Sequence, residues 1–520
     1  MARAVLRCLC LGAVALSSGL GLCSESVFHF GSYYADHMVL QKYPIRAVVW
    51  GYGTVGATVN VTVWSNNSIF SHQITTVNKA ASLGVWKVSL DPIGPGGPFL
   101  VTAEQKHTRH EDRIFLKDVY FGDIWLCGGQ SNMEMTVLQV MNASEELSAA
   151  SHYPYIRLFQ AALKQSDQEL DDLASIAVQW SPPTAEILGK GNFTSFSAVC
   201  WLFGQYLYDQ LQYPIGLVES CWGGTPIEAW SSKSVLNKCG LPVTTGYNNL
   251  TNESTGPHQP TVLWNAMIYP LRRMAIKGAI WYQGEGNAVW HNAEYNCTFP
   301  AMIEDWRKVF HQGSGGTTEI DFPFGFVQLS TYHHEFPDDS FSWIRWHQTA
   351  DFGYAPNPKM RRTFMAVAMD LGDEKSPYGT IHPRYKRDVA YRLHLGARAV
   401  AYGETAVVFQ GPFPRDFQLK NDTELTITYS QALTVLELSK DIFEVYCCTK
   451  RSSSNCAWVS APIVGNSVNT LSLSVTQCRQ KVAGLRYAWN EWPCELKKCP
   501  LYSRGYNLPV PPFIIKPAHN

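Results

Sequence analysis

The sequence predicts an α/β protein with a largely parallel sheet in its central part and a β-rich region on each side. Between about residues 115 and 400, strand-like runs alternate with helical stretches, as in a domain with a parallel sheet. Short apolar runs punctuated by Gly and Pro precede this part, and β-like runs with a cluster of cysteines follow it. A chain of 520 residues is long enough for two or three domains.

The composition excludes several classes of protein. Hydrophobic residues make up 46% and charged residues 16%, so the chain can bury large cores and is neither disordered nor collagen-like. The 42 Lys and Arg nearly balance the 43 Asp and Glu, without a long basic run. We therefore expect no nucleic-acid groove and no surface for anionic membranes.

The first 23 residues have the pattern of a signal peptide. A short positive region precedes the apolar run Cys8–Leu22, which is too short and too rich in small residues to span a membrane well. Gly21-Leu22-Cys23 is a plausible cleavage site before Ser24. We expect a cleaved signal, no membrane anchor and a place in the secretory pathway, either lysosomal or secreted.

Sequons agree with that compartment. An Asn-x-Ser/Thr sequon marks a glycosylation site when the chain enters the secretory route. There are eight: Asn60, Asn66, Asn142, Asn192, Asn249, Asn252, Asn296 and Asn421.

The cysteines predict disulfides. Without the three in the signal peptide, 11 of the 14 cysteines remain, and six of them crowd the last quarter of the chain. His519 is the only His beyond position 394, so a zinc site is poorly supported there and no metal is expected. The odd total leaves at least one thiol free or paired with another chain, and the pairing stays open.

The N-terminal β-rich region is predicted over residues 24–112. Residues 39–41, 47–50 and 59–64 are short apolar or alternating runs, and the turn Pro95-Gly96-Gly97-Pro98 follows them. Several short strands with such punctuation predict a small sandwich.

The α/β domain is predicted over residues 113–402, and the cysteine-rich β region over 403–520. Because α/β domains hold ligands beyond the carboxyl ends of their strands, the residues after each strand are the candidates for a site. The expected strands are Asp118–Cys127, Pro214–Ser220, Gly278–Tyr282, Phe324–Leu329 and Phe364–Met369.

Ser131 is the candidate nucleophile. It follows a buried-looking strand and two glycines, and a helical stretch through Glu146 follows it. At such a turn the hydroxyl reaches the sheet edge and the serine's own amide, at a helix N-terminus, can donate to an oxyanion. A plain helix cap is the alternative, since Ser and Asn are favoured there.

His382 is the candidate base. It precedes Pro383, which suits the first position of a helix and pushes its predecessor into an extended conformation. His382 therefore ends a loop after the strand Phe364–Met369, at the same sheet edge as Ser131. An ordinary helix-entry residue is the alternative.

Two more strand ends offer donors for an oxyanion hole. Gly223 and Gly224 follow one strand, and Gln283 follows another. Backbone amides of these glycines and the Gln283 side chain are candidates to stabilise a tetrahedral intermediate. The alternative is that the glycines simply turn the chain.

These segments carry a resemblance. Gly129-Gln130-Ser131-Asn132-Met133, Trp222-Gly223-Gly224-Thr225, Gln283-Gly284-Glu285 and Ile381-His382-Pro383 resemble the SGNH-type carbohydrate esterases, and more closely the sialate O-acetylesterase family. The likeness extends over essentially the whole mature chain. It implies an SGNH-hydrolase-like domain, Ser131 as nucleophile, His382 as base, and an oxyanion hole of Ser131, Gly223 or Gly224, and Gln283.

The third member of a catalytic triad is left open. Related enzymes commonly carry an acid two or three residues before the His, where this chain has Gly379 and Thr380. Asp370 and Asp373 are nearby candidates, and a dyad whose imidazole is oriented by a backbone carbonyl is the alternative. Gly286, and less clearly Gly128, stand where the resemblance leads us to expect Ser.

The resemblance implies a serine esterase that removes O-acetyl groups, with 9-O-acetyl among them, from free or conjugated sialic acids without a cofactor. The substrate carboxylate suits an Arg, and Arg345 and Arg384 lie in plausible stretches. One alternative is an acetyl esterase for another glycan, such as a xylan. Another is a glycan-binding glycoprotein whose esterase site has decayed.

Overall fold

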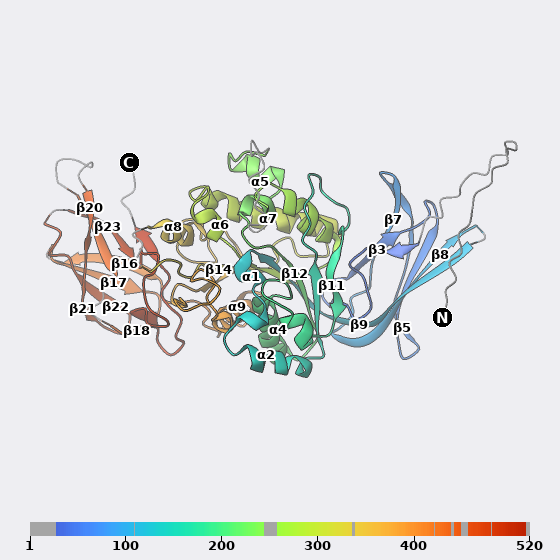
Figure 1. Ribbon diagram of the computed structural model, residues 1–520, viewed down its shortest axis with the longest axis horizontal. Coiled ribbons are helices and arrows are strands. Elements are labelled where there is room, and N and C mark those ends of the chain that lie inside the picture. Colours follow the sequence, from blue (N-terminus) through green and yellow to red (C-terminus); the bar gives the residue numbers. More distant parts are fainter. Residues whose placement is uncertain are drawn as a thin grey trace, which may run out of the picture.

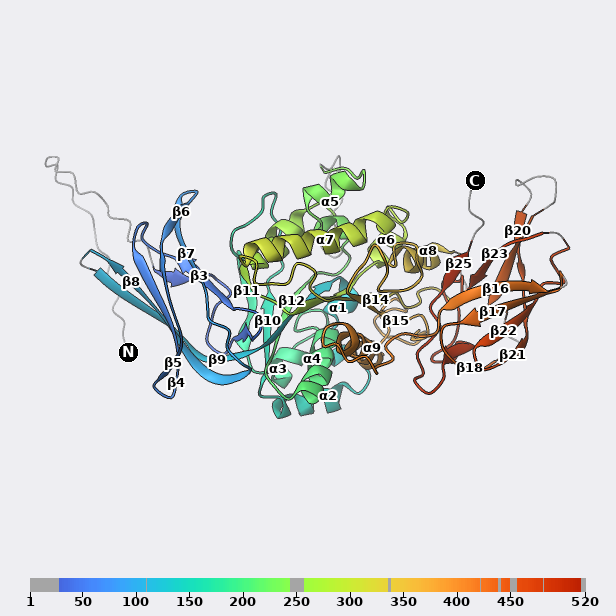
Figure 2. The same cartoon turned by 180° about the vertical axis from the view of Figure 1, so that it is seen from behind.

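The computed structural model describes residues 28–108, 110–243, 257–334, 338–420, 422–437, 441–448, 456–479 and 481–515. The expected signal peptide and the sequons at Asn249, Asn252 and Asn421 lie outside these residues. The chain forms three parts in a row, with an α/β part between two β-rich parts (Figures 1 and 2). The predicted fold class is therefore confirmed.

The N-terminal part contains two sheets. One has the order β1-β3-β7-β6, with β1 (His29–Phe30), β3 (Val48–Tyr52), β7 (Leu83–Ser89) and β6 (Asn78–Ala80). The other contains β2 (Val39–Gln41), β4 (Thr58–Ser65), β5 (Ser68–Thr76), β8 (Gly96–His107) and the first half of β9 (His110–Gly129). Val59, Val61 and Val63 of β4 are fully buried, as the alternation of this strand predicts.

Strand β9 joins the N-terminal part to the central part. Its first half pairs antiparallel with β8, and its second half lies between β12 and β13 in the parallel sheet. The strand passes without a break through residues 112 and 113, where the sequence predicts a domain boundary. The two parts therefore share one continuous strand that ends two residues before Ser131.

The central sheet has the order β11-β10-β12-β9-β13-β14-β15. All its pairs are parallel except β10–β11. Because Gly129 of β9 is level with Cys221 of β12 and Tyr282 of β13, the three strands end at the same edge. The other strands are β10 (Ile156–Ala161), β11 (Ile176–Ser181), β12 (Ile215–Cys221), β13 (Gly278–Tyr282), β14 (Phe324–Gln328) and β15 (Thr363–Val367).

Helices cover both faces of this sheet (Figures 1 and 2). One face carries α2 (Ala143–Ala149), α3 (Ala185–Gly189), α4 (Ala198–Leu211) and α9 (Lys386–Val400), and the other carries α5 (Lys233–Lys238), α6 (Glu285–Ala288), α7 (Tyr295–Gly313) and α8 (Ser340–His347). Shorter turns are α1 (Ser131–Glu134), η1 (Val137–Gln139), η2 (Ala150–His152), η3 (Ile227–Trp230), η5 (Trp264–Ile268) and η6 (Tyr269–Arg273).

Two expected helix boundaries are wrong. The stretch from Ser131 through Glu146 is not one helix, because Met135 leaves the helical conformation with ψ 129° and Thr136 starts a new turn through a capping box with Gln139. The helix after His382 begins at Lys386 instead of Pro383. Both differences shorten the helices next to the candidate site.

The C-terminal part contains three small sheets. Their orders are β16-β17-β22-β21, β18-β24 and β20-β19-β23-β25. The strands are β16 (Pro414–Lys420), β17 (Glu424–Tyr429), β18 (Leu433–Val435), β19 (Phe443–Cys448), β20 (Cys456–Ser460), β21 (Ile463–Asn466), β22 (Thr470–Ser474), β23 (Lys481–Tyr487), β24 (Leu501–Ser503) and β25 (Phe513–Ile515).

The predicted disulfides are present, and one thiol is left over. The six cysteines of the last quarter form Cys447–Cys478, Cys448–Cys456 and Cys494–Cys499. Cys127–Cys200 and Cys239–Cys297 lie in the central part. Among the described residues, Cys221 is free, and it is buried.

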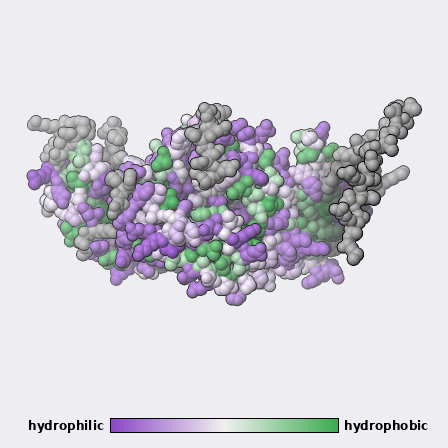
Figure 3. Space-filling model, in the orientation of Figure 1, coloured by the Kyte–Doolittle hydropathy of each residue, from purple (hydrophilic) through white to green (hydrophobic). Residues whose placement is uncertain are grey.

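Apolar side chains gather in the interior. Trp125, Trp281 and Trp306 are fully buried around the central sheet. The face shown in Figure 3 is mainly hydrophilic, with hydrophobic residues in small separate groups. Within the described ranges, no helix has the length and apolar character needed to cross a membrane.

Candidate active site

The backbone places Ser131 at the carboxyl edge of the sheet. Strand β9 ends at Gly129, whose φ is +143°. A Cβ on Gly129 would lie 2.2 Å from the Tyr282 carbonyl oxygen, so only glycine lets the two strands approach this closely. Gln130 caps α1, and Ser131 is the first residue of that helix.

His382 meets Ser131 at hydrogen-bond distance. Its Nε2 lies 2.8 Å from the Ser131 Oγ, and its Nδ1 lies 2.8 Å from the Tyr378 carbonyl oxygen. Because a carbonyl can only accept, Nδ1 carries the proton and Nε2 accepts from the serine hydroxyl. Burial, together with the nearby Lys386 ammonium, lowers the pKa of His382 below its usual 6.5. The imidazole is therefore neutral at neutral pH, as a general base must be.

Neither predicted acid orients this imidazole. Asp373 is bound by Arg384, whose Nε donates to its Oδ2 at 2.7 Å. Burial alone would raise the pKa of Asp373, but the Arg384 guanidinium holds it below its usual value. The expectation that Asp373 is the third triad member is corrected, because the Tyr378 carbonyl occupies Nδ1 and a salt bridge occupies the carboxylate.

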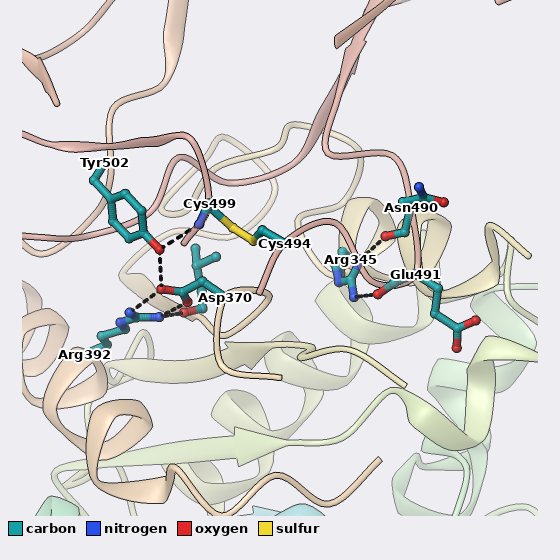
Figure 4. The surroundings of a disulfide bond; sticks show 9 residues. Arg345, Asp370, Arg392, Asn490, Glu491, Cys494, Cys499 and Tyr502 are labelled. Carbon is teal, nitrogen blue, oxygen red and sulfur yellow. Dashed lines mark hydrogen bonds and ion pairs between the residues drawn. A yellow bond between two sulfur atoms is a disulfide. The ribbon is translucent and has the colours of Figure 1, made fainter. Parts of the chain in front are cut away.

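Asp370, the other candidate for the third triad member, does not orient His382 either. It is fully buried, and Arg392 donates to both of its oxygens at 2.6 and 2.9 Å. The Tyr502 hydroxyl adds a further hydrogen bond of 3.1 Å from the C-terminal part (Figure 4). Asp370 therefore forms an ion pair within the central part and accepts a hydrogen bond from the C-terminal part, and the arrangement at Ser131 is the dyad that the sequence left open.

Two backbone amides near the nucleophile are the candidates for the oxyanion hole. The Ser131 amide is among the first N–H groups of α1, which a helix leaves without a backbone acceptor. The Gly223 amide lies close by, since a Cβ on Gly223 would be 3.3 Å from the Ser131 Cβ. In the structure this amide donates to Glu134 Oε2 at 2.7 Å, a contact that the sequence did not predict.

Gln283 and Gly224 are placed differently from the expectation. Gln283 is fully buried, and its Nε2 donates to the Thr225 carbonyl oxygen and to Asn287 Oδ1 at 3.2 and 2.8 Å. Because both of its N–H groups are used, the expected oxyanion role of Gln283 is corrected to one of holding the loop after β12. Gly224 turns that loop with φ +72°, and its carbonyl oxygen lies 2.8 Å from His258 Nε2.

Asn132 ties the nucleophile to the base. Its Nδ2 donates to Glu285 Oε1 at 2.5 Å and to the Ile381 carbonyl oxygen at 2.9 Å. Its Oδ1 accepts from Lys386 Nζ at 2.5 Å. Burial lowers the pKa of Lys386 to about 7. Sequence reasoning missed the network of Asn132, Glu285 and Lys386, although Asn132 lies beside Ser131 and Lys386 lies four residues after His382, at the start of α9.

The two glycines noted as departures fit their surroundings closely. A Cβ on Gly286 would lie 3.0 Å from the Thr225 carbonyl oxygen, and one on Gly128 would lie 3.0 Å from the Trp281 ring. The Gly286 amide also donates to Gln130 Oε1 at 3.1 Å, which fixes the residue before the nucleophile. Gly286 therefore belongs to the scaffold that positions Ser131.

The arrangement has the chemical parts of a serine esterase. A hydroxyl donates to a neutral imidazole whose second nitrogen is held by a carbonyl, and Gly223 lies close to the serine that carries this hydroxyl. Within the described ranges, no group of three or more His, Cys, Asp or Glu side chains is arranged to hold a metal ion.

Comparisons with known proteins give the family. Residues 121–376 match the family described as carbohydrate esterase, sialic acid-specific acetylesterase, and residues 416–517 match the sialate O-acetylesterase C-terminal domain. The chain is 52% identical to a sialate O-acetylesterase from Homo sapiens, over 96% of this chain and 93% of that one. For the sialate O-acetylesterase from Mus musculus, the identity is 49% over 98% and 97%. The chain belongs to the sialate O-acetylesterase family. It is an esterase.

A solved structure supports this membership. A carbohydrate acetylesterase from Xanthomonas citri matches with a TM-score of 0.76 and 27% identity, over 94% of this chain and 100% of that one. In this family member the carboxyl edge of the central sheet carries the Ser131–His382 pair.

Proposed function

We propose that the protein hydrolyses O-acetyl esters of sialic acids, 9-O-acetyl esters among them, through an acetyl-serine intermediate. The observation that carries this proposal is the 2.8 Å contact between Ser131 Oγ and His382 Nε2 in a chain of the sialate O-acetylesterase family. An intact nucleophile–base pair is what an esterase needs. It counts against a binding protein with a decayed site.

In the first half of the reaction, Ser131 Oγ attacks the acetyl carbonyl carbon while His382 Nε2 takes the hydroxyl proton. The Tyr378 carbonyl keeps Nδ1 protonated, so Nε2 stays free to act as the base. The Ser131 amide, joined by the Gly223 amide, stabilises the oxyanion of the tetrahedral intermediate. The imidazolium then gives its proton to the sugar oxygen as that C–O bond breaks.

In the second half, water attacks the acetyl-serine carbonyl and His382 takes a proton from it. Collapse of the second tetrahedral intermediate releases acetate, and His382 returns the proton to Ser131 Oγ. Each proton that His382 accepts is given up within the cycle. The enzyme therefore returns to the state seen in the structure.

Arg384 is the proposed partner of the sialate carboxylate. It lies two residues after His382, is fixed by Asp373, and keeps about 26% of its side chain exposed. Arg345 is unsuitable, because it is fully buried and donates to backbone carbonyls. Of the aromatic residues near the site, Trp281 and Tyr282 are buried in the core, whereas Trp222 is partly exposed beside Gly223 and can face a sugar ring.

The deciding experiment measures acetate release from 9-O-acetylated sialic acid by the mature chain, with Ser131→Ala and His382→Ala in parallel. We expect activity in the parent and losses of at least about a thousandfold in both variants. Acetylated xylose is the competing substrate. A parent that prefers acetylated xylose would refute the sialate substrate, and a fully active Ser131→Ala variant would refute the mechanism.

We also propose that the chain passes through the secretory pathway to a lysosomal or extracellular destination. Five disulfides support an oxidising compartment. The sequon residues Asn66, Asn142 and Asn192 are exposed and accessible to glycosylation. Asn60 and Asn296 are half-buried, and Asn296 donates to Asp351 at 2.6 Å. Mass spectrometry of the secreted chain before and after glycosidase treatment tests this proposal.

A further inference from the structure

A carboxyl group accepts a hydrogen bond from one of the two amides proposed for the oxyanion hole. Glu134, the last residue of α1, accepts from the Gly223 amide through Oε2 at 2.7 Å. A Cβ built on Gly223 would lie 3.3 Å from the Ser131 Cβ and 2.7 Å from Glu134 Oε2. The carboxyl therefore lies where a second donor to the oxyanion is needed.

An ionised Glu134 opposes the reaction in two ways. A carboxylate is a strong acceptor, so it holds the Gly223 N–H away from the substrate oxygen. It also places a negative charge beside the oxygen on which negative charge develops in the transition state. A neutral carboxyl removes the charge and is a weaker acceptor, so the Gly223 amide becomes available.

We propose that Glu134 controls the oxyanion hole through its protonation: the protonated carboxyl releases the Gly223 amide for the oxyanion, and the carboxylate withholds it. The proposal rests on the esterase mechanism at Ser131. It adds a positioning residue that acts through Gly223 and does not itself exchange atoms with the substrate.

The surroundings place this ionisation in the neutral range. Burial raises the pKa of Glu134 to about 7, against the opposing effect of the Gly223 N–H. Two titratable groups of β12 interact with it: burial raises the pKa of Glu219 to about 8 and that of the Cys221 thiol well above its usual value. The thiol therefore stays neutral while Glu134 titrates, and Glu219 ionises at a higher pH than Glu134. The other titratable groups near Ser131 are His382, which contacts its hydroxyl, and Lys386, which donates to the neighbouring Asn132.

Two ionisations then set the limits of the pH range in which the enzyme is active. His382 must be neutral to act as the base. Activity therefore rises as the pH passes the pKa of His382, which lies below 6.5. Glu134 must be protonated, so activity falls as the pH passes about 7. Activity is therefore expected to be highest between the pKa of His382, which lies below 6.5, and that of Glu134 at about 7.

The test compares the parent with Glu134→Gln, in which a neutral amide replaces the carboxyl. Values of kcat/KM for 4-nitrophenyl acetate are measured from pH 4.5 to 9, with S131A as the blank. We expect the parent to fall above pH 7 and Glu134→Gln to lose this fall. Between pH 6 and 8.5, the ratio of variant to parent should rise by roughly thirtyfold, as expected for a group that titrates near 7. Asp305→Asn is the control, because burial also raises the pKa of Asp305, which lies on α7.

Several results would overturn the proposal. These are a parent profile that stays flat from pH 7 to 9, the same fall in Glu134→Gln, or loss of activity in a folded Glu134→Gln at every pH. Thermal melting shows whether Glu134→Gln is folded. If it is not, the rate at which a fluorophosphonate labels Ser131 in the parent still reports the titration of Glu134. A labelling rate that stays constant above pH 7 would then refute the proposal. Activity toward 4-nitrophenyl acetate without release from acetylated sialic acid would instead refute the proposed substrate alone.

Discussion

A backbone carbonyl, instead of a carboxylate, orients His382, the proposed base. Tyr378 accepts from Nδ1 of His382, and the tight turn in which Gly379 accepts from the His382 amide keeps this carbonyl in place. The nearby Asp373 binds Arg384. In the proposed mechanism, the charge of Asp373 therefore acts through Arg384 on substrate binding and not on proton transfer.

Asp373→Asn tests this division of roles. The variant weakens the hold on Arg384, so KM for 9-O-acetylated sialic acid should rise about tenfold while kcat changes less than about threefold. With 4-nitrophenyl acetate, which has no carboxylate, both constants should stay near those of the parent. If Asp373 were the third triad member, kcat would fall by about four orders of magnitude with both substrates. Steady-state kinetics with the two esters distinguishes these outcomes.

Asn132 is the residue that joins the two catalytic loops. It donates to the Ile381 carbonyl oxygen next to His382 and accepts from Lys386. Asn132→Ala leaves the buried Lys386 and Glu285 without their shared partner, so we expect kcat to fall by about 10- to 100-fold and stability to drop by about 1–3 kcal/mol. Kinetics and urea unfolding check this. Unchanged values for both would show that the network does not position Ser131.

Among the elements, the end of strand β9 sets the geometry of the site. A Cβ added to Gly129 would lie 2.2 Å from the Tyr282 carbonyl oxygen, and the φ of Gly129 is in the region that favours glycine. We expect Gly129→Ala to push β9 and β13 apart, with a loss of more than about 3 kcal/mol in the free energy of unfolding and most of the activity. Gly94→Ala is the matched control, because a Cβ there meets open space. Equal stability of the two variants would contradict the prediction.

The strand ends could be predicted from sequence, whereas the partners at those ends could not. The run Gly278–Tyr282 coincides with β13, and Ser131 and His382 were placed at one edge because parallel strands end together. Side-chain direction after the strand is decided by tertiary contacts. Gln283 points into the core toward Asn287, and Asp370 points to Arg392, and neither contact has a local signal in the sequence.

At the scale of the whole molecule, Arg345 connects the central and C-terminal parts. From α8 it donates to the carbonyl oxygens of Leu329 and Ser330 in the central part, at 2.9 and 2.8 Å. In the C-terminal part it donates to those of Asn490 and Glu491, at 2.9 and 2.8 Å (Figure 4). Burial lowers the pKa of Arg345 to about 10, so the side chain stays charged at neutral pH. One buried guanidinium thus satisfies backbone groups of two parts that lie more than a hundred residues apart in sequence.

Replacing this guanidinium should uncouple the two parts. In Arg345→Met four carbonyls lose their donor, three of them in buried residues, so we expect a loss of about 3–5 kcal/mol and a C-terminal part that unfolds before the central sheet. Urea unfolding followed by tryptophan fluorescence, together with hydrogen exchange of the β19 amides, separates the two events. Arg486→Met is the control, because Arg486 pairs with Glu444 inside the C-terminal part and does not reach the central one. If Arg345→Met unfolds in one transition and Arg486→Met in two, the connection lies elsewhere, with the Asp370–Tyr502 contact as the next residue pair to test.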